Sequence, residues 1–191
     1  MRKLIVEEWL SLDGYTSDRE GKLDFFAKHV RGSYTAYRAG ILDTIDTILF
    51  GRNTYSQFAA LWPERPVEGD PLAEKINTAK KIVFSGTLHE APWGKWAPAE
   101  IERGSLTDSV AALKAMPGKD MIIWGSVTTA QRLMKAGLVD EYHIHVCPTL
   151  TAGGTKFFTE AMQPESLTLV HIDRYSPIDI VHLHYTQNQP E

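Results

Sequence analysis

The sequence predicts an α/β protein: a three-layer sandwich whose mixed, mostly parallel sheet carries helices on both faces and ends in a C-terminal antiparallel hairpin. Two observations predict this class. Short β-branched runs alternate with amphipathic segments along most of the chain, which is typical of parallel strands joined by crossover helices. Two strand-like runs then follow each other directly around Ser176 and Pro177, which indicates a hairpin.

The first half of the chain supplies three predicted strands and two predicted helices. The strands, each a short apolar run bounded by turn-forming residues, are residues 4–10, 44–50 and 81–84. Apolar residues at helical spacing predict helices over residues 24–42 and 54–61. Residues 62–75 contain prolines, glycine and acids, so we interpret them as a surface loop.

The second half continues the alternation and then closes the sheet. Residues 93–103 are ambiguous, and their pattern is compatible with a strand that ends before Gly104. The predicted helices are residues 106–116 and 127–136, and the predicted strands are residues 121–124, 141–146, 167–175 and 178–186. We therefore expect one domain over residues 1–186 and a polar tail over residues 187–191.

Composition and charge exclude several classes of protein. The chain has 191 residues, a net charge of −4 and no basic stripe, which argues against nucleic acid as the main partner. Cys147 is the one cysteine, so no intrachain disulfide can form, and a lone thiol fits a reducing cytoplasm. Glu7 and Glu8 interrupt the opening apolar run, so we expect neither a signal peptide nor a membrane span. A small molecule is the expected partner.

A glycine corner lies at residues 51–54 (Gly-Arg-Asn-Thr), where a predicted strand ends and a helix begins at once. The first turn of a helix has unpaired N–H groups and a partial positive charge, so anions bind there. Arg52 adds a forked guanidinium that suits a phosphate, and Thr54 adds a hydroxyl. An ordinary βα turn with a surface arginine and a capping threonine has the same pattern.

A second corner follows the strand 121–124, at Gly125 and Ser126. Glycine permits close approach of the backbone, and Ser126 can cap the helix and donate to a phosphate. A third strand ends at Ser85 and Gly86. Each corner alone is also typical of a plain turn, and the full G-x-G-x-x-G pattern is missing. Three such corners in one sheet predict a cradle for an extended molecule with several phosphates.

These segments, in this order, resemble the dihydrofolate reductase superfamily. The chain is most similar to the branch that holds the reductase domain of bacterial riboflavin biosynthesis and its stand-alone relatives. The matching segments are residues 11–14 (Ser-Leu-Asp-Gly), 46–55, 82–85, 122–126, 137–141, 148–150 and 153–158. The resemblance covers the chain from Leu4 to Tyr185.

The resemblance implies that NADPH is the cofactor and that the corners hold it. Arg52 and Thr54 would lie near its 2′-phosphate and pyrophosphate, and Ser85 would lie by the adenine ribose. An arginine beside that ribose favours NADPH over NADH. Trp9 and Thr16 would contact the nicotinamide through their backbone. The full set of residues implied to bind the cofactor is Trp9, Thr16, Gly51, Arg52, Asn53, Thr54, Ser85, Gly125, Ser126, Val127 and Thr128.

The resemblance also implies the reduction of a small heterocycle or a ribose-derived imine. The nearest activities are those of 5-amino-6-(5-phosphoribosylamino)uracil reductase, in riboflavin biosynthesis, and of dihydrofolate reductase-like enzymes. Dihydrofolate reductases bind the pterin through an acid on the first long helix, whereas the helix predicted over residues 24–42 has acids only at its ends, Asp24 and Asp43. The alternative is a catalytically inactive nucleotide- or ligand-binding module on the same fold.

Three further residues are assigned roles at the substrate. Asp13 could deliver a proton from the loop after the first strand, although a short acid before Gly14 also satisfies the backbone donors of a turn. Phe26 and Tyr37 could flank a planar substrate, although packing in the core explains both aromatic rings as well.

Histidines alternate on two predicted strands. His143 and His145 share one face of the sheet, and so do His182 and His184, because side chains two apart in a strand point the same way. Strand histidines are commonly surface or hydrogen-bonded residues, and no carboxylate cluster accompanies these, so we expect no metal site even with Cys147 nearby. The closing hairpin and the aromatic content are compatible with a homodimer.

Overall fold

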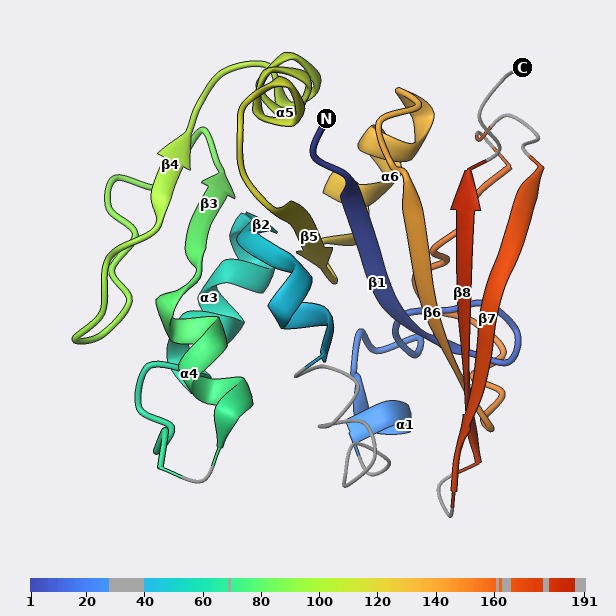
Figure 1. The fold of residues 1–191 in the computed structure, drawn as a ribbon. Coiled ribbons are helices and arrows are strands. Elements are labelled where there is room, and N and C mark those ends of the chain that lie inside the picture. Colours follow the sequence, from blue (N-terminus) through green and yellow to red (C-terminus); the bar gives the residue numbers. More distant parts are fainter. Residues whose placement is uncertain (28–39, 69, 161, 163–165, 177–178, 188–191) are drawn as a thin grey trace.

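A computed structural model describes residues 1–27, 40–68, 70–160, 162, 166–176 and 179–187, and its centre is one eight-stranded sheet (Figure 1). The strands are β1 (Leu4–Ser11), β2 (Ile45–Gly51), β3 (Lys80–Phe84), β4 (Glu100–Glu102), β5 (Asp120–Trp124), β6 (Glu141–Cys147), β7 (Leu167–Tyr175) and β8 (Ile180–Gln187). The helices are α1 (Asp24–Ala27), α3 (Arg52–Leu61), α4 (Pro71–Thr78), α5 (Leu106–Ala115) and α6 (Val127–Lys135), and residues 40–44 are also helical.

The strand order across the sheet is β4-β3-β2-β5-β1-β6-β8-β7. Neighbouring strands from β4 to β6 pair in parallel, whereas β8 pairs antiparallel with both β6 and β7. The predicted fold class is therefore confirmed, including its C-terminal hairpin. Within the hairpin, β7 forms the edge of the sheet, and β8 lies between β7 and β6.

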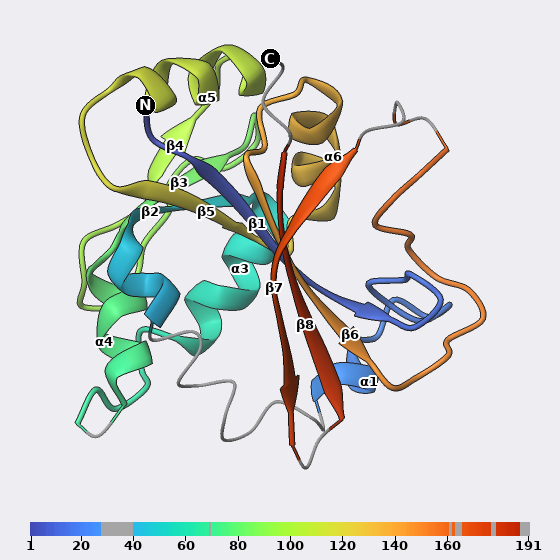
Figure 2. The ribbon, with the colours of Figure 1, turned by 45° about the vertical axis from the view of Figure 1, so that its right-hand side comes forward.

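Helices cover both faces because the buried strands are apolar on both sides (Figures 1 and 2). On one face, Ile48 and Trp124 pack in the same cluster as Tyr55 of α3 and Ile76 of α4. On the other face, residues such as Leu49 pack in a cluster with α5 and α6. Successive strand residues alternate between these two clusters, which fixes the register of each strand against its helices.

The expectation of a loop over residues 62–75 is wrong at its end, because α4 begins at Pro71. Proline is tolerated in the first turn of a helix, where its missing N–H would have no partner in any case. The Asp70 carboxylate caps the helix by accepting hydrogen bonds from the N–H groups of Leu72 and Ala73, both at 3.1 Å. Ile76 then anchors the helix in the core, with its side chain fully buried.

Other predicted elements lie partly outside the described residues or have shifted bounds. Most of the helix expected over residues 24–42 lies outside the described residues, and its described parts, α1 and residues 40–42, are helical. Within residues 93–103 only β4 is a strand. Gln187, assigned to a polar tail, belongs to β8: it pairs with Leu167, and its N–H donates to the Asp140 carbonyl at 3.0 Å.

The central strand β1 pairs unequally with its two neighbours. It pairs with β5 from Leu4 only as far as Glu7, which lies opposite Trp124, but it pairs with β6 as far as Ser11. The carboxyl half of β1 therefore runs on beyond β5, beside the edge where ligands of parallel α/β sheets bind. No helix within the described residues is long and apolar enough to cross a membrane.

Candidate functional site

The three predicted corners meet at one edge of the sheet. Strands β3, β2 and β5 are neighbours and run in parallel, so their carboxyl ends lie side by side. Ser85 follows β3, Gly51 ends β2 and Gly125 follows β5. Segments that are far apart in the sequence thus form one continuous rim, as the sequence predicted.

Two hydrogen bonds join the β2 and β5 corners directly. The Gly51 N–H donates to the Ser126 hydroxyl at 2.9 Å, and the Ser126 N–H donates to the Thr54 hydroxyl at 2.9 Å. Each corner therefore supplies a side-chain acceptor to the backbone of the other. Because the two amides are satisfied within the protein, an anion at this rim would take its donors from the following amides of the α3 and α6 first turns, which have no partner inside their helices.

Glycine suits the geometry at both corners. A Cβ atom on Gly51 would lie 2.8 Å from the Thr129 hydroxyl oxygen, too close for a side chain. Gly125 has a φ of +52°, and Ser126 after it is also left-handed, with a φ of 51°. The capping role predicted for Ser126 is wrong: in this conformation its side chain makes no capping hydrogen bond to α6 and instead accepts from Gly51.

Arg52 and Ser85 are brought together through Thr87. An Arg52 guanidinium N–H donates to the Thr87 hydroxyl at 2.9 Å, and the N–H of Thr87 donates to the Ser85 hydroxyl at 3.2 Å. The N–H of Leu88 donates to the same Ser85 oxygen at 3.1 Å. Arg52 and Thr87 are exposed, so the guanidinium is held over the rim while it still faces water. Thr87 stood in the third corner of the sequence, but without an assigned role.

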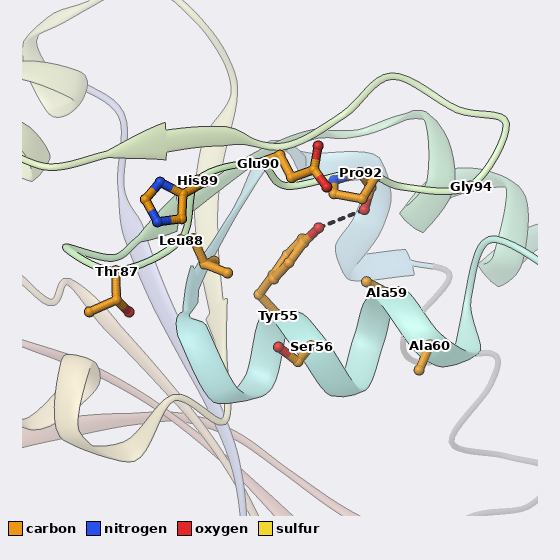
Figure 3. Close-up of a pocket in the computed structure, with 10 residues that line it drawn as sticks. All are labelled: Tyr55, Ser56, Ala59, Ala60, Thr87, Leu88, His89, Glu90, Pro92 and Gly94. Atoms are coloured by element: carbon orange, nitrogen blue, oxygen red, sulfur yellow. Dashed lines mark hydrogen bonds between the residues drawn. The ribbon is translucent and has the colours of Figure 1, made fainter.

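An open groove of about 660 Å³ runs beside this arginine, between α3 and residues 87–94 (Figure 3). The Tyr55 side chain reaches from α3 toward the loop, and its hydroxyl donates to the Pro92 carbonyl at 2.6 Å. This bond ties the loop to the helix. Desolvation, with the nearby Glu90 carboxylate, raises the pKa of Tyr55. The Tyr55 phenol therefore stays neutral, and its bond to Pro92 holds one wall of the groove.

Glu8, which the sequence analysis passed over, is the most perturbed acid near the end of β1. It lies one residue beyond the last β1–β5 pair, and only 7% of it is exposed. One carboxyl oxygen accepts from the Trp9 N–H at 3.0 Å, and the other has no hydrogen-bond partner among the described residues. Burial, and to a lesser degree the Glu7 charge, raises the pKa of Glu8 to about 8. A buried acid within a strand of apolar residues was the available signal.

The two predicted nicotinamide contacts are already engaged through their amides. The Trp9 N–H is bound to Glu8, and the Thr16 N–H donates to the Thr155 carbonyl at 2.8 Å. The Trp9 ring stacks on the His145 ring, with 4.5 Å between the centroids.

Asp13 joins two loops. Its carboxylate accepts hydrogen bonds from the N–H groups of Thr151 and Ala152, at 3.2 and 2.8 Å. Slight desolvation raises the pKa of Asp13, but these bonds and one from Ser11 outweigh it, so the pKa is lowered. An ionised carboxylate that clamps a loop is a weak proton donor. Of the predicted substrate contacts, Tyr37 lies outside the described residues, and Phe26 lies in α1, where the structure does not describe its side chain.

The chain is similar to a known protein family and to a protein of related sequence. The family model described as RibD C-terminal domain matches residues 2–180. YyaP, an uncharacterized protein of Bacillus subtilis, is 28% identical over 181 residues, which cover 92% of this chain and 90% of YyaP.

Two solved structures show the same fold. A putative riboflavin biosynthesis protein from Shewanella sp. PV-4 superposes with a TM-score of 0.76 at 24% identity, covering 98% of this chain and 99% of that one. A dihydrofolate reductase from Enterococcus faecalis, complexed with NADP(H), superposes with a TM-score of 0.59 at 15% identity, covering 98% of this chain and 97% of that one. The family resemblance inferred from the sequence is confirmed.

Proposed function

Because this chain belongs to the RibD C-terminal domain family, we propose that it is an NADPH-dependent reductase of a small heterocyclic substrate. Its nearest activities would be those of 5-amino-6-(5-phosphoribosylamino)uracil reductase, in riboflavin biosynthesis, or of a dihydrofolate reductase-like enzyme. The observation that carries the proposal is the rim where the corners at Gly51 and Gly125 are hydrogen-bonded to each other and Arg52 is held above them.

The residues at the rim fit a dinucleotide with an extra phosphate. The missing Cβ of Gly51 lets the Thr129 side chain pack against the β2 corner, and two helices begin at the rim. Arg52 would hold the 2′-phosphate with Ser85 and Thr87, since a guanidinium binds phosphate oxygens bidentately. The amides that would follow the pyrophosphate are those of Asn53, Thr54, Val127 and Thr128.

When bound, NADPH supplies a hydride, and the reduction of a C=N bond then requires one proton at nitrogen. We assign that proton to Glu8. Its carboxyl group can remain protonated near neutral pH, and it lies where β1 runs past β5. Asp13, the donor proposed from the sequence, is held ionised by its loop amides and is better explained as a clamp. Water would reprotonate Glu8 after each turnover.

A non-catalytic nucleotide-binding module is the second candidate. The acid that dihydrofolate reductases place on the first long helix is missing from the middle of residues 24–42. The amides of Trp9 and Thr16 are also occupied within the protein. The first feature would weaken substrate binding, and the second would weaken the contact with the nicotinamide; both leave the phosphate end of the rim intact.

Two measurements test the proposal. Fluorescence titration with NADPH should give saturable binding at submillimolar concentration; absence of binding there would remove the cofactor claim. Pterins, pyrimidines and quinones should then be screened for substrate-dependent consumption of NADPH. Tight NADPH binding without consumption in any class would favour the module over the reductase.

A homodimer in the cytoplasm remains part of the proposal. The edge strand β7 exposes apolar side chains, with exposed fractions of 49% at Leu169, 52% at Val170 and 56% at Ile172. An edge strand of this kind can be covered by a second copy of the chain. Sedimentation equilibrium of the full chain should give twice the monomer mass; a monomer at all concentrations would contradict it.

A further inference from the structure

One face of the antiparallel pair β6–β8 gathers the strand histidines into a stack. His143 lies opposite His184, and His145 lies opposite His182. The centroids of the His143 and His184 rings are 4.0 Å apart, and those of the His145 and His182 rings are 4.8 Å apart. The prediction that each pair shares a face is confirmed. The fold adds what the sequence analysis passed over, because Glu141 at the start of β6 brings a carboxylate against the stack.

The geometry at Glu141 points to a metal centre. One carboxylate oxygen of Glu141 lies 3.5 Å from Nε2 of His143 and 3.2 Å from Nε2 of His184. The three residues can offer ligand atoms that all lie within 4.8 Å of one another. Metal–ligand distances of about 2.0–2.1 Å in a tetrahedral zinc site separate neighbouring ligand atoms by about 3.3–3.5 Å. The two distances from the Glu141 oxygen to the histidine nitrogens are therefore close to this separation.

We propose that Glu141, His143 and His184 form a binding site for Zn²⁺ or a similar divalent transition metal. Two imidazoles and one carboxylate are a common three-ligand set for zinc, and a water molecule completes it. The side chains of Glu141 and His184 are 12% and 19% exposed, so an ion can enter from the solvent. His143 forms the buried side of the site, with 8% of its side chain exposed.

Neighbouring groups hold these ligands in place. Nδ1 of His143 lies 3.2 Å from Nε2 of His182, and this contact orients the His143 ring with its Nε2 toward Glu141. The second oxygen of Glu141 accepts from the Lys3 ammonium at 2.6 Å. Metal-binding histidines and carboxylates in proteins are usually oriented by such outer hydrogen bonds.

The charge of the site also suits a cation. The hydrogen bond with His143 and the nearby Lys3 outweigh desolvation and lower the pKa of Glu141 to about 2, while burial lowers the pKa of His184. The Glu141 carboxylate is thus ionised at neutral pH, and the His184 imidazole favours its neutral form, as a metal requires. Without a metal, protons shared among these groups would account for the same short distances, and this is the competing explanation.

The site is separate from the cofactor rim and does not depend on the proposed function. It lies at the amino end of β6, whereas the rim lies at the carboxyl ends of the parallel strands. An ion there would join β6 to β8 and clamp the hairpin to the parallel sheet. Its expected role is structural, with a measurable effect on thermal stability.

The test uses the full chain without a histidine tag, stripped with a chelator and titrated with Zn²⁺ by calorimetry at neutral pH. We expect one ion per chain and a higher melting temperature with Zn²⁺. His184→Asn and Glu141→Gln should each weaken binding by about 100-fold or more, since loss of even an outer-shell partner costs about 10–100-fold. His89→Asn is the matched control, because His89 is exposed in the groove at α3 and should not change binding.

Substitution with Co²⁺ provides a readout that does not depend on folded variants. Four-coordinate Co²⁺ bound to the wild-type chain should give intense visible bands, and added Zn²⁺ should abolish them. The proposal is overturned if the wild-type chain binds no Zn²⁺ below millimolar concentration, since the cluster is then a proton-sharing network. Equal binding by wild type, His184→Asn and Glu141→Gln would also overturn it, and would assign the ion to exposed groups such as His171.

Discussion

The rim at the carboxyl ends of β2, β3 and β5 and the histidine stack between β6 and β8 are both polar, but they are built in opposite ways. The rim is made of small residues and one exposed arginine, and its hydrogen bonds run between backbone amides and hydroxyls. The stack is made of large ionisable side chains, most of them buried, that contact each other across the sheet. The first arrangement leaves donors for a ligand's oxygens, and the second gathers lone pairs for a cation.

This difference shows how one sheet can serve two ligands of opposite charge. Parallel strands end together and expose helix N-termini, which favour anions. The antiparallel pair instead places side chains directly opposite each other, so that His143 meets His184. The following predictions test whether the two regions are as distinct as this contrast suggests.

The largest effect is expected from Glu8→Gln. If Glu8 delivers the proton, the amide cannot replace it, and the rate of substrate reduction should fall by about 10²–10⁴-fold. The wild-type rate should also decline as the pH rises through about 8, the pKa of Glu8, and the variant should lose that decline. Steady-state rates across this pH range measure both effects. An unchanged rate would leave the proton to water or to another group.

The same variant should change how stability depends on pH. The folded pKa of Glu8, about 8, lies above its unfolded value, so folding favours the protonated acid. This stabilisation is complete below the unfolded pKa, about 4.3, and is lost as the pH rises through 8; it amounts to about 5 kcal/mol. Urea unfolding of wild type across this range should show the loss, whereas Glu8→Gln should not. Parallel curves would show that Glu8 is solvated.

A smaller effect is expected from Arg52→Ala. Losing a charge-assisted contact of about 1.5–3 kcal/mol should weaken NADPH binding by about 10–100-fold, and NADH, which lacks the 2′-phosphate, should be little affected. Fluorescence titrations with both nucleotides measure the difference. Arg132→Ala on α6 is a matched control with another exposed arginine. Equal losses for NADPH and NADH would contradict the assignment of Arg52 to the 2′-phosphate.

The smallest expected effect is that of Zn²⁺ at the histidine stack on NADPH binding at the rim. They share no residue, and effects at sites without shared partners usually add. Saturating Zn²⁺ should therefore change the dissociation constant of NADPH by less than about twofold. NADPH titrations with Zn²⁺ and with a chelator provide the comparison. A larger change would mean that β1, which pairs with both β5 and β6, couples the two regions.

The rim could be predicted from the sequence because each part of it is local. A strand, a glycine and a helix start are contiguous at Gly51 and again at Gly125, and parallel strands bring such ends together. The hydrogen bonds between Ser126 and the residues at 51 and 54 could not be predicted, because they depend on the left-handed conformation at Ser126.

The histidine stack is less accessible from the sequence. Alternation showed which histidines share a face, but not that His143 lies opposite His184, because register depends on how the two strands pair. Glu141, two residues before His143, follows the same alternation and was a signal for the carboxylate beside the stack. The raised pKa of Glu8 likewise follows mainly from its burial in the folded chain. Pro71 fell within the loop predicted over residues 62–75, although it begins α4.

The position of β8 has a consequence for how the chain folds during synthesis. β8 follows β7 in the sequence but lies between β7 and β6, so β7 cannot join the sheet before β8 has left the ribosome. Until then β6 has an open edge, which can pair with the wrong strand of another molecule. The hairpin of β7 and β8 must therefore dock as a unit, and that late step completes the pairing of His143 with His184.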